Sequence, residues 1–141
     1  MHPGFARTYR ENAVLTASPG QLVLMLFDGA LRALAQSRDA FGRPETDTRR
    51  IEIINQQLLK AQAIIAELQG GLNFASGGEV AQTLNRLYDY YNRRLQEANL
   101  RKQVAPVEEV ERLLGQLRSG WAEMLVQQGG AAPAEPLRGV A

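Results

Sequence analysis

The chain has 141 residues, of which 45% are hydrophobic and 22% are charged, as is usual for one globular domain. It contains no cysteine and one histidine, His2, which argues against disulfides, thiolate chemistry, His-ligated metals and phosphohistidine relays. Sixteen basic and fifteen acidic residues leave a net charge of +1, so no strong field favours nucleic acid or an acidic membrane surface.

The longest apolar run covers residues 22–27, far short of the roughly 20 residues that span a bilayer. The start of the chain has no basic stretch followed by an apolar one, so no signal peptide is expected. These features predict a cytoplasmic protein without direct membrane insertion.

The first expected helix covers residues 19–41. Residues 1–17 show no sustained hydrophobic period and are predicted to form an N-terminal arm. Ser18 suits the N-cap, Pro19 suits the first helical position, and Gln21 completes a capping box.

A second helix is predicted to follow Asp47 or Thr48, either of which can cap it, and to weaken at Gly70 and Gly71. Its apolar positions alternate by three and four residues, as in a heptad seam. They are Ile51, Ile54, Leu58, Ala61, Ile65, Leu68 and Leu72.

Ser76 and Glu79 resemble a second capping box, which predicts that a third helix opens there. Its predicted apolar stripe is Val80, Leu84, Leu87, Tyr91, Leu95 and Ala98.

A fourth helix is predicted from Pro106 to Gln127, with acidic residues in its first turn. Its predicted stripe is Val107, Val110, Leu114, Leu117, Trp121 and Met124. The sequence thus predicts an all-α protein, with an antiparallel four-helix bundle over 18–127, the arm over 1–17 and a flexible, disordered tail over 128–141.

Helix one carries more apolar surface than one buried stripe requires. Its first seam is Leu22, Leu26, Gly29, Ala33 and Ser37, and its second is Leu24, Phe27, Leu31 and Leu34. Three explanations are open: the helix lies centrally with both faces in the core, the arm covers one face through Tyr9, Val14 or Leu15, or one face is a groove for a partner helix. On the third hypothesis, Phe27→Glu or Leu31→Glu would abolish partner binding while the bundle stays helical.

Helix three offers a second candidate contact surface. Tyr88 and Tyr90 flank the line of Tyr91, and tyrosines supply large contact area at low entropic cost. The alternative is that Tyr91 is core and the other two cover the edges of the seam.

Catalytic patterns are missing from the sequence. No helical histidine exists for a di-iron bundle, and no glycine-rich phosphate loop occurs. Asp28 reads as a solvated or locally paired helix acid, and Glu97 is placed to pair with Arg93. The basic cluster on helix three (Arg86, Arg93, Arg94, Arg101 and Lys102) is interleaved with acids and reads as a solvated face. We therefore expect no enzyme, cofactor, metal or nucleic-acid partner.

Several blocks in order resemble the flagellin-specific export chaperone family of bacterial flagella. The most specific are Thr-Ala-Ser-Pro at 16–19 and Met-Leu-Phe-Asp-Gly at 25–29. The other blocks are residues 14–15, 22–24, 30–31, 60–68, 77–79, 87–90, 94–95 and 97–99, with Tyr9, Leu84 and Trp121. The resemblance covers about residues 9–125.

The resemblance implies a helical cytosolic chaperone that binds the disordered C-terminal segment of flagellin in apolar grooves. It implies that binding prevents premature polymerisation and delivers flagellin to the flagellar export gate, a membrane protein. Leu22, Met25 and Leu26 match one family block, Tyr88 and Tyr90 match another, and Tyr9 matches the arm's tyrosine.

From the seams and these matches together, the predicted client contacts are Leu22, Leu24, Met25, Phe27, Leu31, Leu34, Tyr88 and Tyr90. Tyr9, Val14 and Leu15 are the predicted arm or gate contacts. We expect a monomer or weak dimer. The alternative is a helical adaptor or secretion chaperone for a different client.

Overall fold

Capping residues decide where the first helix begins. In the computed structural model, which describes residues 17–131, α2 spans Pro19–Phe41. The Gln21 backbone N–H donates to Ser18 Oγ at 3.2 Å, and the Ser18 N–H donates to Gln21 Oε1 at 3.1 Å. The predicted capping box is therefore confirmed.

The second helix, α3, spans Arg50–Gly70 and begins later than its predicted cap. Its N-cap is Arg49, which makes no side-chain capping bond. Asp47 Oδ1 instead accepts the Arg49 N–H at 2.9 Å, because the chain makes turns before the helix starts. The prediction that Asp47 or Thr48 is the N-cap is wrong. The seam is confirmed from Ile54 to Leu68, whereas Ile51 is half-exposed.

The third helix, α4, spans Phe74–Arg101 and is broken near its start. Asn73, not Ser76, is the N-cap, and its Oδ1 accepts the Ser76 N–H at 3.2 Å. Gly78 then adopts φ 54° and ψ −129°, which interrupts the helix. The predicted capping box at Ser76 and Glu79 is therefore wrong.

The buried stripe of α4 also differs from its prediction at the N-terminal end. Val80 is 67% exposed. The residues that enter the core are Ala81, Tyr88, Tyr91, Leu95 and Ala98. Steps of three and four residues back from Tyr91 lead to Ala81. Ala81 therefore continues the buried seam of α4, and Val80 lies next to the seam on the exposed side.

The fourth helix, α5, spans Ala105–Ala131, four residues beyond the predicted boundary at Gln127. Val107, Val110 and Leu114 are fully buried as predicted, whereas Leu117, Trp121 and Met124 are half-buried. The burial of the stripe thus decreases toward the C-terminal end of α5. Residues 1–16 and 132–141, which hold most of the predicted arm and tail, lie outside the described residues.

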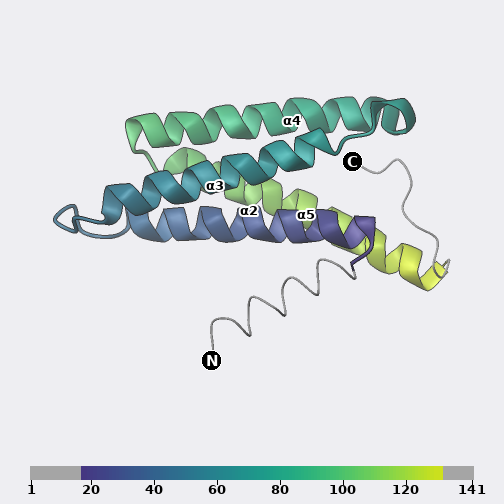
Figure 1. Ribbon diagram of the computed structural model, residues 1–141, viewed down its shortest axis with the longest axis horizontal. Coiled ribbons are helices and arrows are strands. Elements are labelled where there is room, and N and C mark those ends of the chain that lie inside the picture. Colours follow the sequence, from purple (N-terminus) through teal and green to yellow (C-terminus); the bar gives the residue numbers. More distant parts are fainter. Residues whose placement is uncertain (1–16, 132–141) are drawn as a thin grey trace.

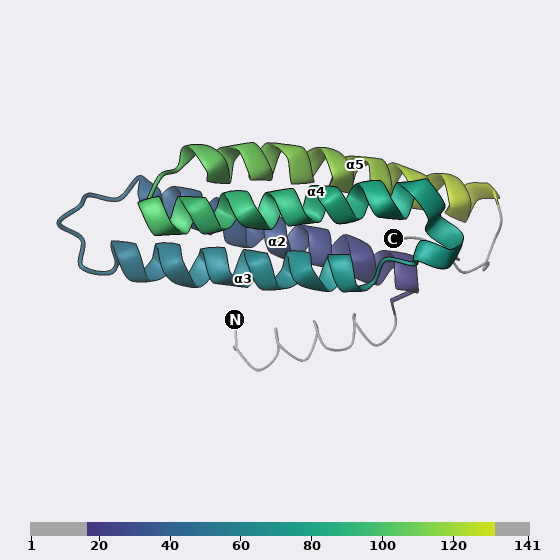
Figure 2. The same ribbon diagram turned by 90° about the horizontal axis from the view of Figure 1, so that it is seen from above.

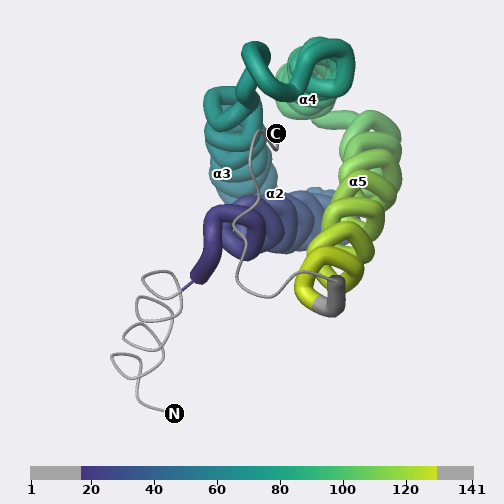
Figure 3. The backbone as a smooth tube through the Cα atoms, turned by 90° about the vertical axis from the view of Figure 1, so that its right-hand side faces the viewer, coloured from purple at the N-terminus to yellow at the C-terminus, as the bar shows by residue number. Residues whose placement is uncertain are grey.

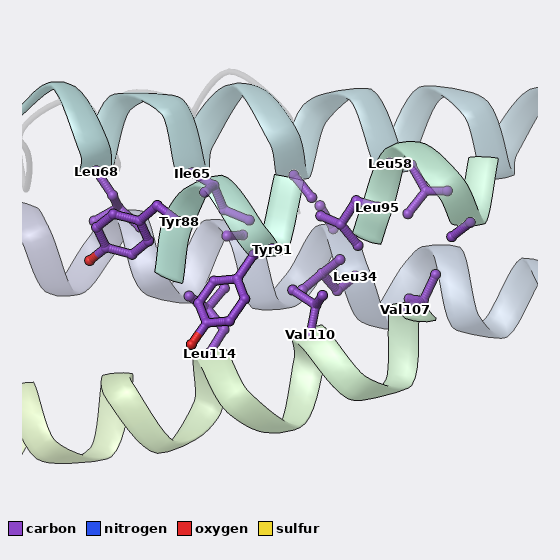
Figure 4. Packing of buried hydrophobic residues seen from close by; sticks show 14 of the residues in the cluster. Leu34, Leu58, Ile65, Leu68, Tyr88, Tyr91, Leu95, Val107, Val110 and Leu114 are labelled. Carbon is purple, nitrogen blue, oxygen red and sulfur yellow. The ribbon is translucent and has the colours of Figure 1, made fainter. Parts of the chain in front are cut away.

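The four helices form the predicted antiparallel bundle (Figures 1 and 2). α2 packs against α3 and α5, and α4 packs against the same two helices, so α2 and α4 lie on a diagonal (Figure 3). Between them lies a core of aliphatic side chains around Tyr88 and Tyr91 (Figure 4). No strand occurs in residues 17–131. All-α architecture is confirmed.

Candidate functional site: an apolar groove between α4 and α5

Glu109 fastens the start of α5 to α4. Its two carboxylate oxygens accept bonds from Tyr90 Oη at 2.7 Å and from Arg94 Nε at 2.6 Å. Arg94 also donates to Glu97 Oε2 at 2.9 Å, so the expected pairing of Glu97 with Arg93 is replaced by one with Arg94. Charge-assisted bonds of this kind hold the two helices together at this end.

The C-terminal half of α5 is tied to α2 instead. Arg118 Nε lies 2.9 Å from Asp28 Oδ1, and Trp121 donates its indole N–H to the Gly20 carbonyl oxygen at 2.8 Å. Figures 1 and 3 show the result, as α5 starts near α4 and runs toward the side of α2. Asp28 is therefore a paired acid, but its partner lies on another helix and the pairing is not the local one that the sequence predicted.

This divergence leaves an apolar cavity of about 490 Å³ between the beginning of α4 and the end of α5. Phe27 lines it from α2. The α4 residues that line it are Ser76, Gly77, Val80, Ala81, Leu84 and Tyr88, and the α5 residues are Gln116, Leu117, Gly120, Trp121 and Met124. An adjoining cavity of about 350 Å³ shares Val80, Leu84 and Leu117 with it and reaches Leu87. We call the two cavities together the α4–α5 groove.

The groove has the chemistry of a site for apolar side chains. Glu79 is the only charged residue among those that line the groove, and it lines the adjoining, smaller cavity. Exposed apolar surface of this kind is unusual on a monomer and marks binding sites. A groove between two helices suits the apolar face of an amphipathic segment.

Three of the predicted contact residues lie in the core. Phe27, Leu34 and Tyr88 are 3%, 0% and 1% exposed. Phe27 and Tyr88 reach the groove only from its floor, and Leu34 does not line it. Burial, and secondarily the neighbouring Tyr91, raises the pKa of Tyr88 to about 12, so its hydroxyl stays protonated. These burials correct the expectation that Phe27 and Leu34 form an exposed face.

The buried stripe of α2 lies between its two predicted seams. Ala33 and Ser37 of the first seam are buried, and so are Phe27 and Leu34 of the second. α2 is not central, because it occupies a corner and packs against two neighbours, α3 and α5. The remaining predicted α2 contacts, namely Leu22, Leu24, Met25 and Leu31, are half-buried and outside the groove.

Tyr90 is half-buried, donates a hydrogen bond to Glu109 and does not line the groove. The predicted arm contacts Tyr9, Val14 and Leu15 lie outside the described residues.

The sequence did not predict the α5 wall of the groove as a binding surface. Leu117, Trp121 and Met124 fit a core stripe, and periodicity alone does not show that the stripe leaves the core. One sequence signal pointed to this wall. Gly120 lies inside the predicted helix, where a glycine lowers helix stability by about 1 kcal/mol relative to alanine. A Cβ at Gly120 would meet no atom within 4 Å, so this glycine leaves the groove wide.

Within residues 17–131, no three His, Cys, Asp or Glu side chains gather as metal ligands would. None of the helices in this part of the chain is long and apolar enough to cross a bilayer.

Residues 2–128 match the family described as flagellar protein FliS. The chain belongs to the FliS family of flagellar secretion chaperones. It is 39% identical to flagellar secretion chaperone FliS of Salmonella typhimurium over 126 residues, which cover 85% of this chain and 86% of the relative. It is 33% identical to FliS of Bacillus subtilis, over 83% of each chain. It is 38% identical to FliS of Escherichia coli, over 86% of this chain and 87% of the relative.

Membership in the FliS family confirms the resemblance seen in the sequence. FliS proteins are chaperones and not enzymes, in agreement with the prediction that this chain catalyses no reaction.

Proposed function

We propose that this FliS-family chain is a cytoplasmic export chaperone that binds the disordered C-terminal segment of flagellin. Binding would prevent premature polymerisation and deliver the client to the flagellar export gate. The observation that supports the proposal is the α4–α5 groove, an apolar surface that the bundle leaves open. A disordered segment that folds on binding offsets its ordering cost by burying apolar side chains in such a groove.

The groove is the main client site in this proposal. Val80, Leu117 and Met124 are accessible groove residues. Leu22, Leu24, Met25 and Leu31 remain predicted client contacts on α2. The roles of Tyr9, Val14 and Leu15 as arm or gate contacts, and a monomeric or weakly dimeric state, remain predictions.

Calorimetry against a peptide of the flagellin C-terminal segment tests the proposal. We expect tight binding, a negative heat-capacity change and a gain of helical circular dichroism beyond the sum of the two parts. Val80→Glu, at a 67% exposed position in the groove, should weaken binding at least tenfold without loss of helix. Val126→Glu is the matched control, because Val126 is 75% exposed and does not line the groove.

Equal losses in the two variants would contradict binding in the groove. Absence of binding by the folded wild-type chain would contradict flagellin as the client. A panel of peptides from other exported proteins would then test the alternative, a secretion chaperone or adaptor for a different client.

A further inference from the structure

The backbone of α4 is broken at one residue. Gly78 has φ 54° and ψ −129°, a conformation that essentially only glycine adopts. The break separates a first turn, Phe74–Gly77, from the long remainder of the helix. Gly78 is the residue inside α4 at which the φ and ψ angles leave the helical range, so the two parts of the helix meet at a kink there.

The first turn makes local hydrogen bonds to its own N-cap residue. Asn73 Oδ1 accepts the Ser76 N–H at 3.2 Å, and the Asn73 carbonyl accepts the Gly77 N–H at 2.7 Å. The last buried side chain before the turn is Leu72, at 9% exposure, and Gly70 and Gly71 precede it. The turn therefore lies between a buried side chain at Leu72 and the kink at Gly78.

The turn forms one end of the α4–α5 groove. Ser76 and Gly77 line the larger cavity, opposite Trp121 and Met124 of α5. Phe74, in the same turn, is 50% exposed, which is unusual for a large aromatic side chain. Figure 3 shows this part of the chain looping over the near end of α4.

We propose that Phe74–Gly77 is a lid that swings about Gly78, opens the end of the groove to the client segment, and closes on the bound segment with Phe74. The proposal rests on the groove being the client site. It explains why a glycine with positive φ lies inside a helix and why an exposed aromatic side chain lies in the same turn as two residues of the groove.

Spin-label distance measurements test the lid in the full-length protein, which has no native cysteine to interfere. One pair is Ala75→Cys on the lid with Ser119→Cys on α5. The control pair is Gln82→Cys, on α4 beyond the break, with the same Ser119→Cys. All three positions are exposed.

In the free protein the lid pair should give a broader distance distribution than the control pair. The flagellin C-terminal peptide should narrow and shift the lid pair only. If the lid pair in the free protein gave a distance distribution as narrow as that of the control pair, the lid proposal would be overturned, whether or not the peptide binds. An equal shift of both pairs would also overturn it, because α4 would then move as one body. Failure of the proposed function appears separately, as absence of peptide binding in calorimetry.

Discussion

The indole Nε1–H of Trp121 donates to the carbonyl oxygen of Gly20 at 2.8 Å, which joins the C-terminal half of α5 to the first turn of α2. The two residues are 101 positions apart in the sequence. The bond holds α5 away from α4, and the groove lies in the space between these two helices. The same side chain therefore fixes the bundle and lines the groove.

Trp121→Phe tests the contribution of this bond. Phenylalanine retains most of the apolar contact but has no donor, so the free energy of unfolding should fall by about 0.5–1.5 kcal/mol. Urea denaturation followed by circular dichroism measures the change. An unchanged midpoint would show that the bond does not stabilise the bundle.

Gly120→Leu separates binding from stability. A Cβ at Gly120 meets open space, and leucine favours helix over glycine by up to about 1 kcal/mol, so the variant should be at least as stable as the wild type. The new side chain would occupy the groove and weaken peptide binding at least tenfold. Gly115→Leu is the control, because Gly115 also has open space at its Cβ but does not line the groove. A stable Gly120→Leu variant that binds normally would place the client elsewhere.

Phe27→Glu should unfold the bundle and not simply block binding. Phe27 is 3% exposed, and an unpaired carboxylate at a buried position costs several kcal/mol. This outcome differs from the sequence-based hypothesis, in which the helix content survives. Thermal unfolding followed by circular dichroism distinguishes the two outcomes. Leu31→Glu, at a half-buried position, should be tolerated better.

Stability should decrease in acid partly through Glu109. Bonds from Arg94, and then from Tyr90, lower the pKa of the Glu109 carboxyl below its ordinary value. Its contribution to the free energy of unfolding is therefore complete above the unfolded pKa of about 4.3 and is lost as the pH falls through the lower folded pKa. Urea midpoints measured from about pH 6 down to pH 3 should fall less steeply for Glu109→Gln than for the wild type. Glu67→Gln, at an exposed position on α3, is the control. Parallel curves for wild type and Glu109→Gln would contradict the assignment.

The sequence by itself determined the number and type of helices and the start of α2. It also determined the seam of α3 from Ile54 to Leu68, because caps and three–four spacing are local properties of the chain. The blocks around residues 16–29 pointed to the family. The sequence did not determine where α4 begins. Asn73 and Ser76 are both suitable N-caps, and Asn73 is the N-cap in the structure, where Gly78 has non-helical φ and ψ angles two residues after Ser76.

Only the tertiary structure decided which apolar residues remain open. The stripe of α5 looks uniform along the sequence, yet Leu114 is buried whereas Leu117 and Trp121 line a groove. The difference arises from the inclination of α5. Bonds between residues 90 and 101 positions apart, Asp28 with Arg118 and Gly20 with Trp121, determine that inclination. Local periodicity cannot contain this information, because it specifies the face of each helix but not the angle at which two helices meet.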